Sequence, residues 1–143
     1  MRDRTHPAVP VRLLRVRWFV PVVDLLLVVL FCAIGRRSHE EAVLTGLLHT
    51  VWPFAVGLVV GWVGAGWLLR RQRKALATTD LLRVWPTGVL LWLATLIVGM
   101  LLRGVSGQGT AVSFIAVAAI VLAVFLLGWR AAAGVLTGLG RTR

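Results

Sequence analysis

The sequence predicts an all-α fold, an integral membrane bundle of four transmembrane helices with both termini in the cytoplasm. Two observations predict the bundle. Hydrophobic residues make up 59% of the 143 residues and charged residues only 15%. Soluble domains usually have about 45–50% apolar residues and about 25% charged residues. The apolar residues also gather in four long stretches, which short charged segments separate. This pattern excludes a disordered chain and disfavours a soluble domain.

Each apolar stretch is long enough to cross the hydrocarbon core, which needs about 17–25 helical residues. The second stretch has 28 residues, so we expect it to tilt, to kink or to begin at the interface. We expect the first stretch to be a retained span and not a cleaved signal peptide, because Asp24 interrupts it and no small-x-small site follows. The predicted spans cover residues 18–34, 42–69, 85–102 and 110–129.

The membrane domain covers residues 18–130, and the segments on either side of it are short. Residues 1–17 are basic, and we expect a cytoplasmic tail that sets the topology, with a short interfacial helix from Val11 as the alternative. Residues 131–143 form a second cytoplasmic tail. Its apolar part either extends the fourth helix or lies on the membrane surface.

The orientation follows from the distribution of positive charge. Thirteen of the 16 Lys and Arg residues lie before the first span, between the second and third spans, or after the fourth. By the positive-inside rule, that side faces the cytoplasm. An aromatic belt is expected there too, and four tryptophans mark it: Trp18, Trp67, Trp85 and Trp129. Because topology explains the net charge of +11, the expected partner is the lipid bilayer and not nucleic acid.

Asp24 is the clearest anomaly inside the predicted spans. It lies six residues past Trp18, about 9 Å into the membrane, where an acid costs up to about 2.5–3.5 kcal/mol on insertion scales. Three interpretations stay open: a proton or cation site, a protonated carboxyl hydrogen-bonded to a neighbouring helix, or an internal ion pair. Candidate partners for such a pair are Arg70, Arg71 and Arg83, at the cytoplasmic helix ends.

His49 is the second polar residue at depth, one turn after Thr45 and one turn before Pro53. It lies about 10 Å from the outer end of its span. Because proline cannot donate to the carbonyl of His49, we expect a bend and a free carbonyl oxygen. A structural histidine beside the bend is the favoured interpretation, and a polar niche is the alternative. About 10 Å of depth separates His49 from Asp24, which excludes a direct acid–base pair and suits a conduction route.

Small residues on the second span indicate close helix packing. Gly57, Gly61 and Gly64 follow a G-x-x-x-G step, a spacing that lets helices approach within a bundle or in a homodimer. On the third span, Thr95 is expected to bond its own backbone.

The outer loops carry a group of basic residues, which we interpret as an outer mouth attractive to anions: Arg36, Arg37, His39 and Arg103. The three histidines are spread over different segments, and the sequence suggests neither a nucleophile with a base nor a cluster of metal ligands. We therefore expect no catalytic residues, no metal and no cofactor.

Four groups of residues resemble the motifs of a known family. They are Asp24 with Gly35-Arg36-x-Ser38-His39, then Trp52-Pro53-x-x-x-Gly57-x-x-x-Gly61-Trp62, then Trp92-x-x-Thr95-x-x-x-Gly99-Met100-x-x-Arg103, and Gly128-Trp129-Arg130. Over about residues 20–130, the chain resembles the small prokaryotic membrane proteins of the domain-of-unknown-function family three thousand and fifty-four. The resemblance implies a four-span protein of a prokaryotic plasma membrane and names no reaction. It adds weight to Asp24, Arg36, His39 and Arg103 as more than topology markers.

Two classes of function stay open. The first is permeation of a small solute or ion, such as a proton or an anion, with Asp24, His49 and Thr45 lining the route. The second is a non-catalytic scaffold or accessory subunit of a larger membrane complex, which docks through Gly57 and Gly61. Because four short spans rarely enclose a pore alone, permeation implies an oligomer. We expect a homo-oligomer or a membrane partner subunit in either case, and no enzyme.

Overall fold

A computed structural model describes residues 11–36, 43–71 and 78–139 of the chain. These ranges are mostly helical and contain no strand, which confirms the all-α prediction. Four helices are long and apolar enough to cross a membrane, over residues 18–35, 45–71, 84–105 and 112–136. In chain order the elements are α1 (Val11–Arg36), α2 (Val43–Arg71), α3 (Thr78–Leu81), the π-helical turn η1 (Val84–Gly88), α4 (Val89–Val105) and α5 (Val112–Leu139).

Two helices extend by several residues beyond the predicted spans. α1 begins at Val11, so the second half of the basic N-terminal segment continues into the first membrane helix. α5 continues to Leu139. The residues after Arg130 are mostly alanine, leucine and valine, and no proline interrupts the helix there. Arg130 therefore lies inside a helix and not at its end. Residues 1–10 and 140–143 lie outside the described residues.

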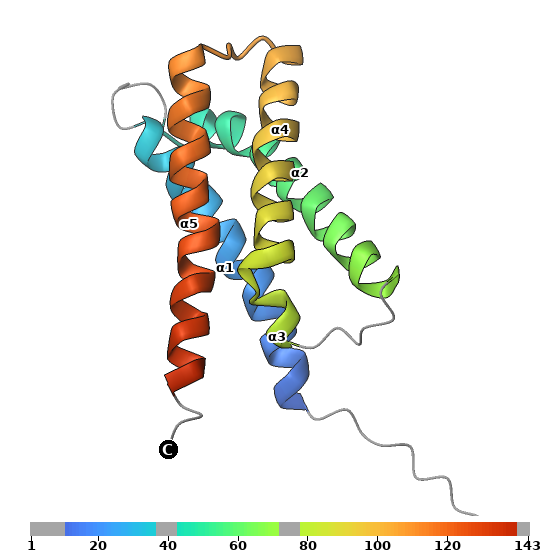
Figure 1. Cartoon of the computed structure of the whole chain (residues 1–143). Helices are drawn as coiled ribbons and strands as arrows, with labels where there is room; N and C mark the ends of the chain where they lie inside the picture. The colour runs from blue at the N-terminus through green and yellow to red at the C-terminus, as the bar shows by residue number, and fades with distance from the viewer. Residues whose placement is uncertain (1–10, 37–42, 72–77, 140–143) are drawn as a thin grey trace, which may run out of the picture.

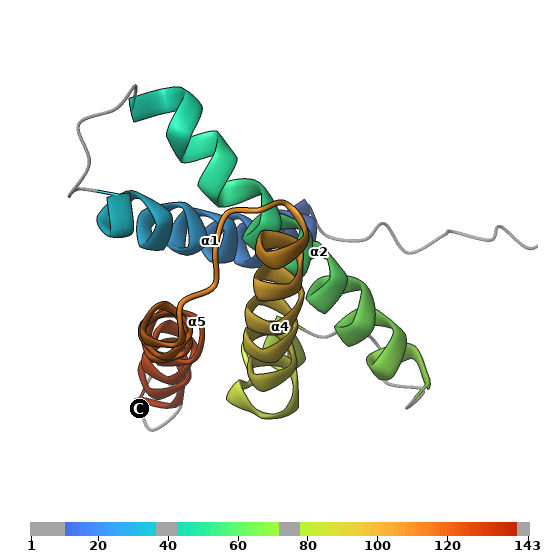
Figure 2. The ribbon, with the colours of Figure 1, turned by 90° about the horizontal axis from the view of Figure 1, so that it is seen from above.

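The four long helices alternate in direction, so α1 begins and α5 ends at the same end of the bundle (Figure 1). We call this the basic end, because α2 finishes there with Arg70 and Arg71. The opposite end, where residues 106–111 join α4 to α5, is the loop end. Seen from above, α4 and α5 are nearly end-on, whereas α2 crosses the view obliquely (Figure 2). The long second span is accommodated by this inclination.

The core lies between all four long helices. Phe31 of α1 meets Phe54 of α2 edge to face, with ring centroids 5.3 Å apart. Around them pack buried residues from every long helix, namely Val28, Cys32, Leu58, Leu91, Ala118 and Leu122. A smaller cluster at the basic end joins Val20, Leu69 and Leu81.

The glycines of α2 face α4 in this core. A Cβ atom on Gly57 would lie 2.9 Å from the Cα and the carbonyl oxygen of Thr95, and one on Gly61 would lie 3.1 Å from the Cα of Leu91. Gly64 is less crowded, 3.7 Å from Leu90. The structure therefore uses the G-x-x-x-G step to pack α2 on α4 within the chain. The docking hypothesis for Gly57 and Gly61 required this face to be open to a second molecule, but α4 occupies it.

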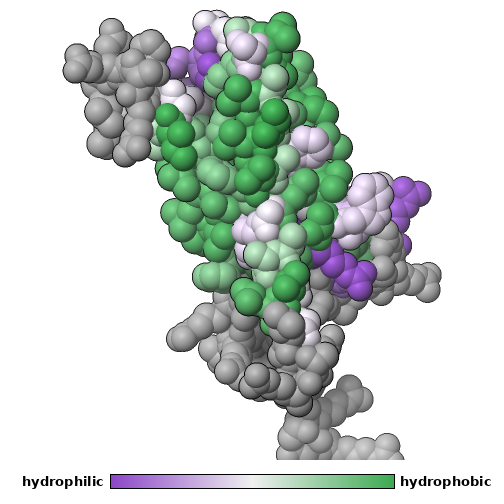
Figure 3. Space-filling model, turned by 60° about the vertical axis from the view of Figure 1, so that its left-hand side comes forward, coloured by the Kyte–Doolittle hydropathy of each residue, from purple (hydrophilic) through white to green (hydrophobic). Residues whose placement is uncertain are grey.

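The outer surface of the bundle is apolar along its middle. Leucine, valine and isoleucine side chains cover the face seen in Figure 3, and hydrophilic residues lie toward its ends. Three tryptophans at the basic end are strongly exposed, as an interfacial belt requires: Trp18 (73%), Trp67 (60%) and Trp85 (74%). With the four apolar helices, this surface supports a membrane protein.

Candidate functional site

A buried ion pair joins the first and last membrane helices at the basic end. Two nitrogens of the Arg130 guanidinium face the two oxygens of the Asp24 carboxylate, with Nη1–Oδ1 at 2.7 Å and Nη2–Oδ2 at 2.6 Å. Both side chains are fully buried. This is the bidentate geometry that planar guanidinium and carboxylate groups favour, and it makes charge-assisted hydrogen bonds of the strong kind.

Further hydrogen bonds complete the site. The Trp129 indole Nε1 donates to Asp24 Oδ1 at 2.9 Å. Arg130 Nη1 also donates to the carbonyl oxygen of Leu126 at 2.8 Å, and its Nε lies 3.4 Å from the carbonyl oxygen of Leu81. The guanidinium carbon lies 5.1 Å from the ring centroid of Trp129 and 6.0 Å from that of Trp62. The pair is neutral as a whole and well supplied with polar partners.

The broken segment before α4 makes room for this arginine. Arg83 has extended backbone angles, φ −68° and ψ 134°, so the chain leaves the helical path there. The Thr87 hydroxyl donates to the carbonyl oxygen of Asp80 at 2.9 Å, which ties the two sides of the break together. A Cβ atom on Gly88 would lie 3.1 Å from Arg130 Cδ. Glycine at this position therefore allows the start of α4 to approach the Arg130 side chain closely.

The partner of Asp24 corrects one expectation. An internal ion pair is present, but Arg70, Arg71 and Arg83 were the wrong candidates. Arg70 and Arg71 are exposed at the end of α2. Arg83 instead lies 3.4 Å from Asp80, with its side chain 58% exposed. The true partner is Arg130, which the charge count assigns to the segment after the fourth span because Trp129 ends that predicted span.

Two signals in the sequence point to Arg130. The residues after it, Ala131–Gly140, stay small and apolar, so the helix has no reason to end there. Arg130 also belongs to the Gly128-Trp129-Arg130 motif, and both Trp129 and Arg130 contact Asp24. Nothing in the sequence marks Gly88 or the Leu81 carbonyl, because both act through tertiary approach.

His49 and Thr45 lie apart from this site. Both are exposed on the loop-end half of α2, whereas Asp24 is enclosed on the basic-end half of α1. The neighbouring Thr50 hydroxyl donates to the carbonyl oxygen of Gly46 at 3.0 Å. Within one chain, the described residues therefore do not bring Asp24, His49 and Thr45 onto a common route.

The predicted outer mouth is described only in part. Arg37 and His39 lie outside the described residues, and so does the side chain of Arg36, the last residue of α1. Arg103 is held in the α4–α5 turn by Gln108, with Nη1–Oε1 at 3.0 Å and Nη2 to the backbone oxygen at 3.2 Å. Its guanidinium carbon lies 4.5 Å from the ring centroid of Phe114. Arg103 thus stabilises the turn.

Among the residues that the structure describes, two polar atoms of the core lack a hydrogen-bond partner, the Thr95 hydroxyl and the Trp62 indole nitrogen. The expectation that Thr95 bonds its own backbone is therefore wrong. Its backbone lies directly against Gly57, so α4 and α2 are in close contact at this position. Trp92 does find an acceptor, the carbonyl oxygen of Ala119 at 2.9 Å.

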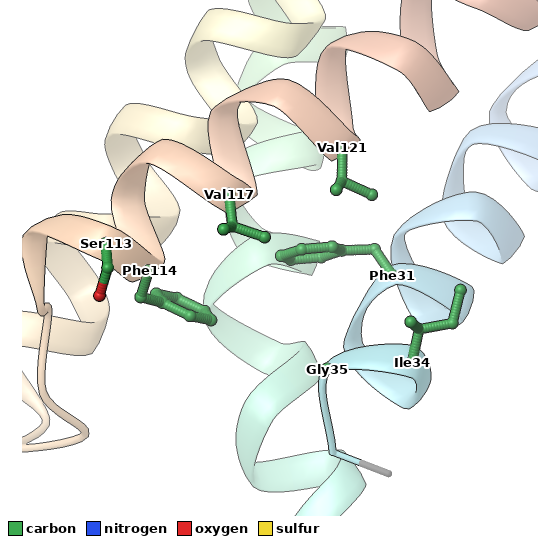
Figure 4. A pocket seen from close by; sticks show the side chains of 7 residues that line it. All are labelled: Phe31, Ile34, Gly35, Ser113, Phe114, Val117 and Val121. Carbon is green, nitrogen blue, oxygen red and sulfur yellow. The ribbon is translucent and has the colours of Figure 1, made fainter. Parts of the chain in front are cut away.

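The cavities at the loop end are apolar. One of about 340 Å³ lies between α1 and α5, where Phe31 points toward Val117 and Val121 and Ser113 supplies the polar atom (Figure 4). A second, of about 360 Å³, lies between α4 and α5 beside Met100 and Thr110. Binding sites for small molecules usually combine an apolar wall with several convergent polar groups, and these two cavities offer very few. In the described ranges, no group of three or more His, Cys, Asp or Glu residues lies together.

The indole of Trp129 provides a test of the site's energetics. Trp129→Phe keeps an aromatic ring but removes the hydrogen bond to Asp24. Hydrogen bonds to charged groups contribute about 1.5–3 kcal/mol, so we expect a loss of that size in unfolding free energy, measured by denaturation in detergent micelles. Trp85→Phe is the control, because Trp85 is 74% exposed. An equal loss in both variants would contradict a special role for Trp129.

Comparison with known proteins gives one match. No curated protein and no solved structure matches the chain. Residues 21–133 match the family described as "Protein of unknown function (DUF3054)". The matched region contains Asp24, Trp129 and Arg130, and it runs from the first membrane helix to the last. The match covers well over half of the sequence, and the chain therefore belongs to the DUF3054 family, as its motifs suggested.

Proposed function

We propose that this protein is a non-catalytic membrane scaffold, an accessory subunit that works by docking to other membrane helices. The observation that carries the proposal is the closed state of the Asp24–Arg130 pair. Both carboxylate oxygens are bonded, and both side chains are buried. An intramembrane acid with all its partners inside the chain holds helices together and leaves nothing for a passing ion to bind.

The main alternative, permeation of a small solute or ion, has less support from this geometry. An ion that used Asp24 would first have to displace a bidentate arginine from a fully buried site, and leaving one member of such a pair without its partner costs about 3–5 kcal/mol. His49 and Thr45, the other residues of the proposed route, face away from the bundle. The flux experiment below tests this alternative, because specific flux would establish permeation in place of the scaffold role.

The orientation belongs to the same proposal. We place the basic end in the cytoplasm and the bundle in the plasma membrane of a prokaryote. Support comes from the excess of Lys and Arg in the segments at this end. The exposed tryptophans of the same end, Trp18, Trp67 and Trp85, are consistent with a headgroup belt.

Flux measurements in liposomes test the proposal. We expect purified wild-type protein to pass protons, anions and cations no faster than protein-free liposomes do, from acid to alkaline pH. Asp24→Asn should be equally silent and should change stability instead. An added ionophore serves as the positive control for detection. Specific flux in the wild type that Asp24→Asn changes would replace the scaffold role by permeation.

Assembly provides the positive half of the test. The chain has a mass of 15.6 kDa. In native mass spectrometry from lipid nanodiscs loaded directly from membranes, a scaffold should appear in assemblies heavier than one chain. A population made only of single chains would contradict the proposal.

A further inference from the structure

We propose that a second copy of this chain docks on the loop-end half of α2, through a stripe formed by Thr45, His49 and Trp52. This inference rests on the proposed scaffold role and names the partner. The three residues are spaced by four and three positions, so they share one helix face. We refer to them as the α2 stripe.

The α2 stripe points away from the rest of its own chain. Thr45 and His49 are exposed, and Trp52 is 40% exposed. Phe54, on the opposite side of the helix, is fully buried in the core. The stripe is therefore the outward face of a helix whose inward face is already packed.

His49 lies within the depth of the hydrocarbon layer. Trp67 is exposed at the basic end, where the Arg71 guanidinium lies 5.1 Å from its ring centroid, so this pair marks the headgroup level. Eighteen positions separate Trp67 from His49, which is about 27 Å along the helix axis. The inclination of α2 shortens this distance along the membrane normal (Figure 2). Since the hydrocarbon core is about 30 Å thick, the imidazole does not reach the opposite headgroups.

An imidazole at this depth needs a protein partner. Histidines in membrane helices almost always face other helices or a water-filled cavity, and they hydrogen-bond across helix interfaces. No described side chain of the same chain hydrogen-bonds to His49. Most exposed positions in the middle of the other membrane helices carry aliphatic side chains that lipid covers well, such as Leu26 of α1, Ile97 of α4 and Ile120 of α5.

The chemistry of the stripe fits a second copy. A neutral imidazole carries one donor and one acceptor, and so does the hydroxyl of Thr45. Two copies related by a two-fold axis would place the same donors and acceptors opposite each other, so each His49 could bond to the His49 or Thr45 of its partner. Two-fold dimers with one self-complementary patch are the commonest oligomers. The glycine face of α2 cannot serve this purpose, because α4 occupies it.

Cysteine cross-linking in native membranes tests the dimer. Cys32, the single cysteine, is buried and is first replaced by alanine. In that background, His49→Cys is compared with Ile120→Cys, which lies on the lipid-facing side of α5 with 65% exposure. Two differently tagged copies are co-expressed and oxidised. We expect a disulfide dimer that carries both tags, at least fivefold more abundant for His49→Cys than for Ile120→Cys.

A second variant tests the hydrogen bonds rather than proximity. His49→Leu keeps an apolar surface on α2 but removes both imidazole nitrogens. We expect the dimer to dissociate about fivefold more readily in nanodiscs, as the loss of hydrogen bonds between membrane helices predicts. The exposed position makes unfolding an implausible cause, and the unchanged thermal stability of the monomer would show this directly.

The outcomes separate the two proposals. Equal dimer yields at positions 49 and 120, or an unchanged dimer in His49→Leu, would overturn the second copy as occupant of the stripe. Cross-linking of His49→Cys to a different protein would also overturn it, while leaving the scaffold role intact. The scaffold role itself fails only through specific flux or a purely monomeric population in the nanodisc experiment.

Discussion

Neutralising one member of the Asp24–Arg130 pair is expected to lower the unfolding free energy by about 3–5 kcal/mol. Arg130→Gln leaves the Asp24 carboxylate in a fully buried site with Trp129 as its remaining described donor. Asp24→Asn leaves the guanidinium charge fully buried beside the rings of Trp62 and Trp129. In both variants an uncompensated buried charge, and not the loss of one contact, causes the destabilisation.

The double variant separates these causes. Asp24→Asn combined with Arg130→Gln removes both charges and keeps side chains of similar shape, so we expect it to be clearly more stable than either single variant. Chemical unfolding of the four proteins in the same detergent gives the coupling energy. Arg83→Gln is the control, because its ion pair with Asp80 is largely exposed on the arginine side and should contribute no more than about 1 kcal/mol. Additive losses in the double variant would show that the two residues act independently.

Alanine at Gly57 is expected to have the second largest effect. The new methyl group would lie 2.9 Å from the Cα and carbonyl oxygen of Thr95. Both atoms belong to the backbone of α4, so the clash can be relieved only if the two helices move apart. Overpacking of this kind usually costs about 1–3 kcal/mol. Gly61→Ala should behave similarly but more mildly, because its nearest atoms in α4 lie 3.1 Å away.

Gly66→Ala provides a matched control on the same helix. Apart from its own helix backbone, no described atom lies within 4 Å of the Cβ position at Gly66, so the substitution should be neutral or slightly stabilising, as the helix propensity of alanine predicts. Thermal unfolding in detergent, followed by far-ultraviolet circular dichroism, compares the three variants. If Gly57→Ala were as stable as Gly66→Ala, the close contact between α2 and α4 would be wrong.

The candidate site shows where sequence reasoning reaches its limit. Asp24 stands out in the sequence, because an acid inside an apolar stretch is costly wherever the helix packs. Its partner does not stand out in the same way. Arg130 lies 106 residues further along, next to a tryptophan that resembles a membrane boundary. Only the packing of α5 against α1, and the break before α4, turn this residue into the counter-ion of Asp24.

The fold also decided whether these polar side chains point toward the core or away from it. A helical period places Thr45, His49 and Trp52 on one face but does not say whether that face meets another helix. The same limit applies to Thr95, whose hydroxyl lacks a described partner while its backbone packs on Gly57.

The sequence by itself determined the helical class, the four membrane spans and their alternating directions. These features depend on local quantities, namely the length and hydropathy of each stretch and the short segments between them. The tertiary structure alone decided that Arg130 neutralises Asp24, that Gly57 and Gly61 pack on α4, and that the α2 stripe faces outward. These outcomes depend on which helix faces meet, because a buried charge or a close approach is satisfied by atoms that lie far away in the chain.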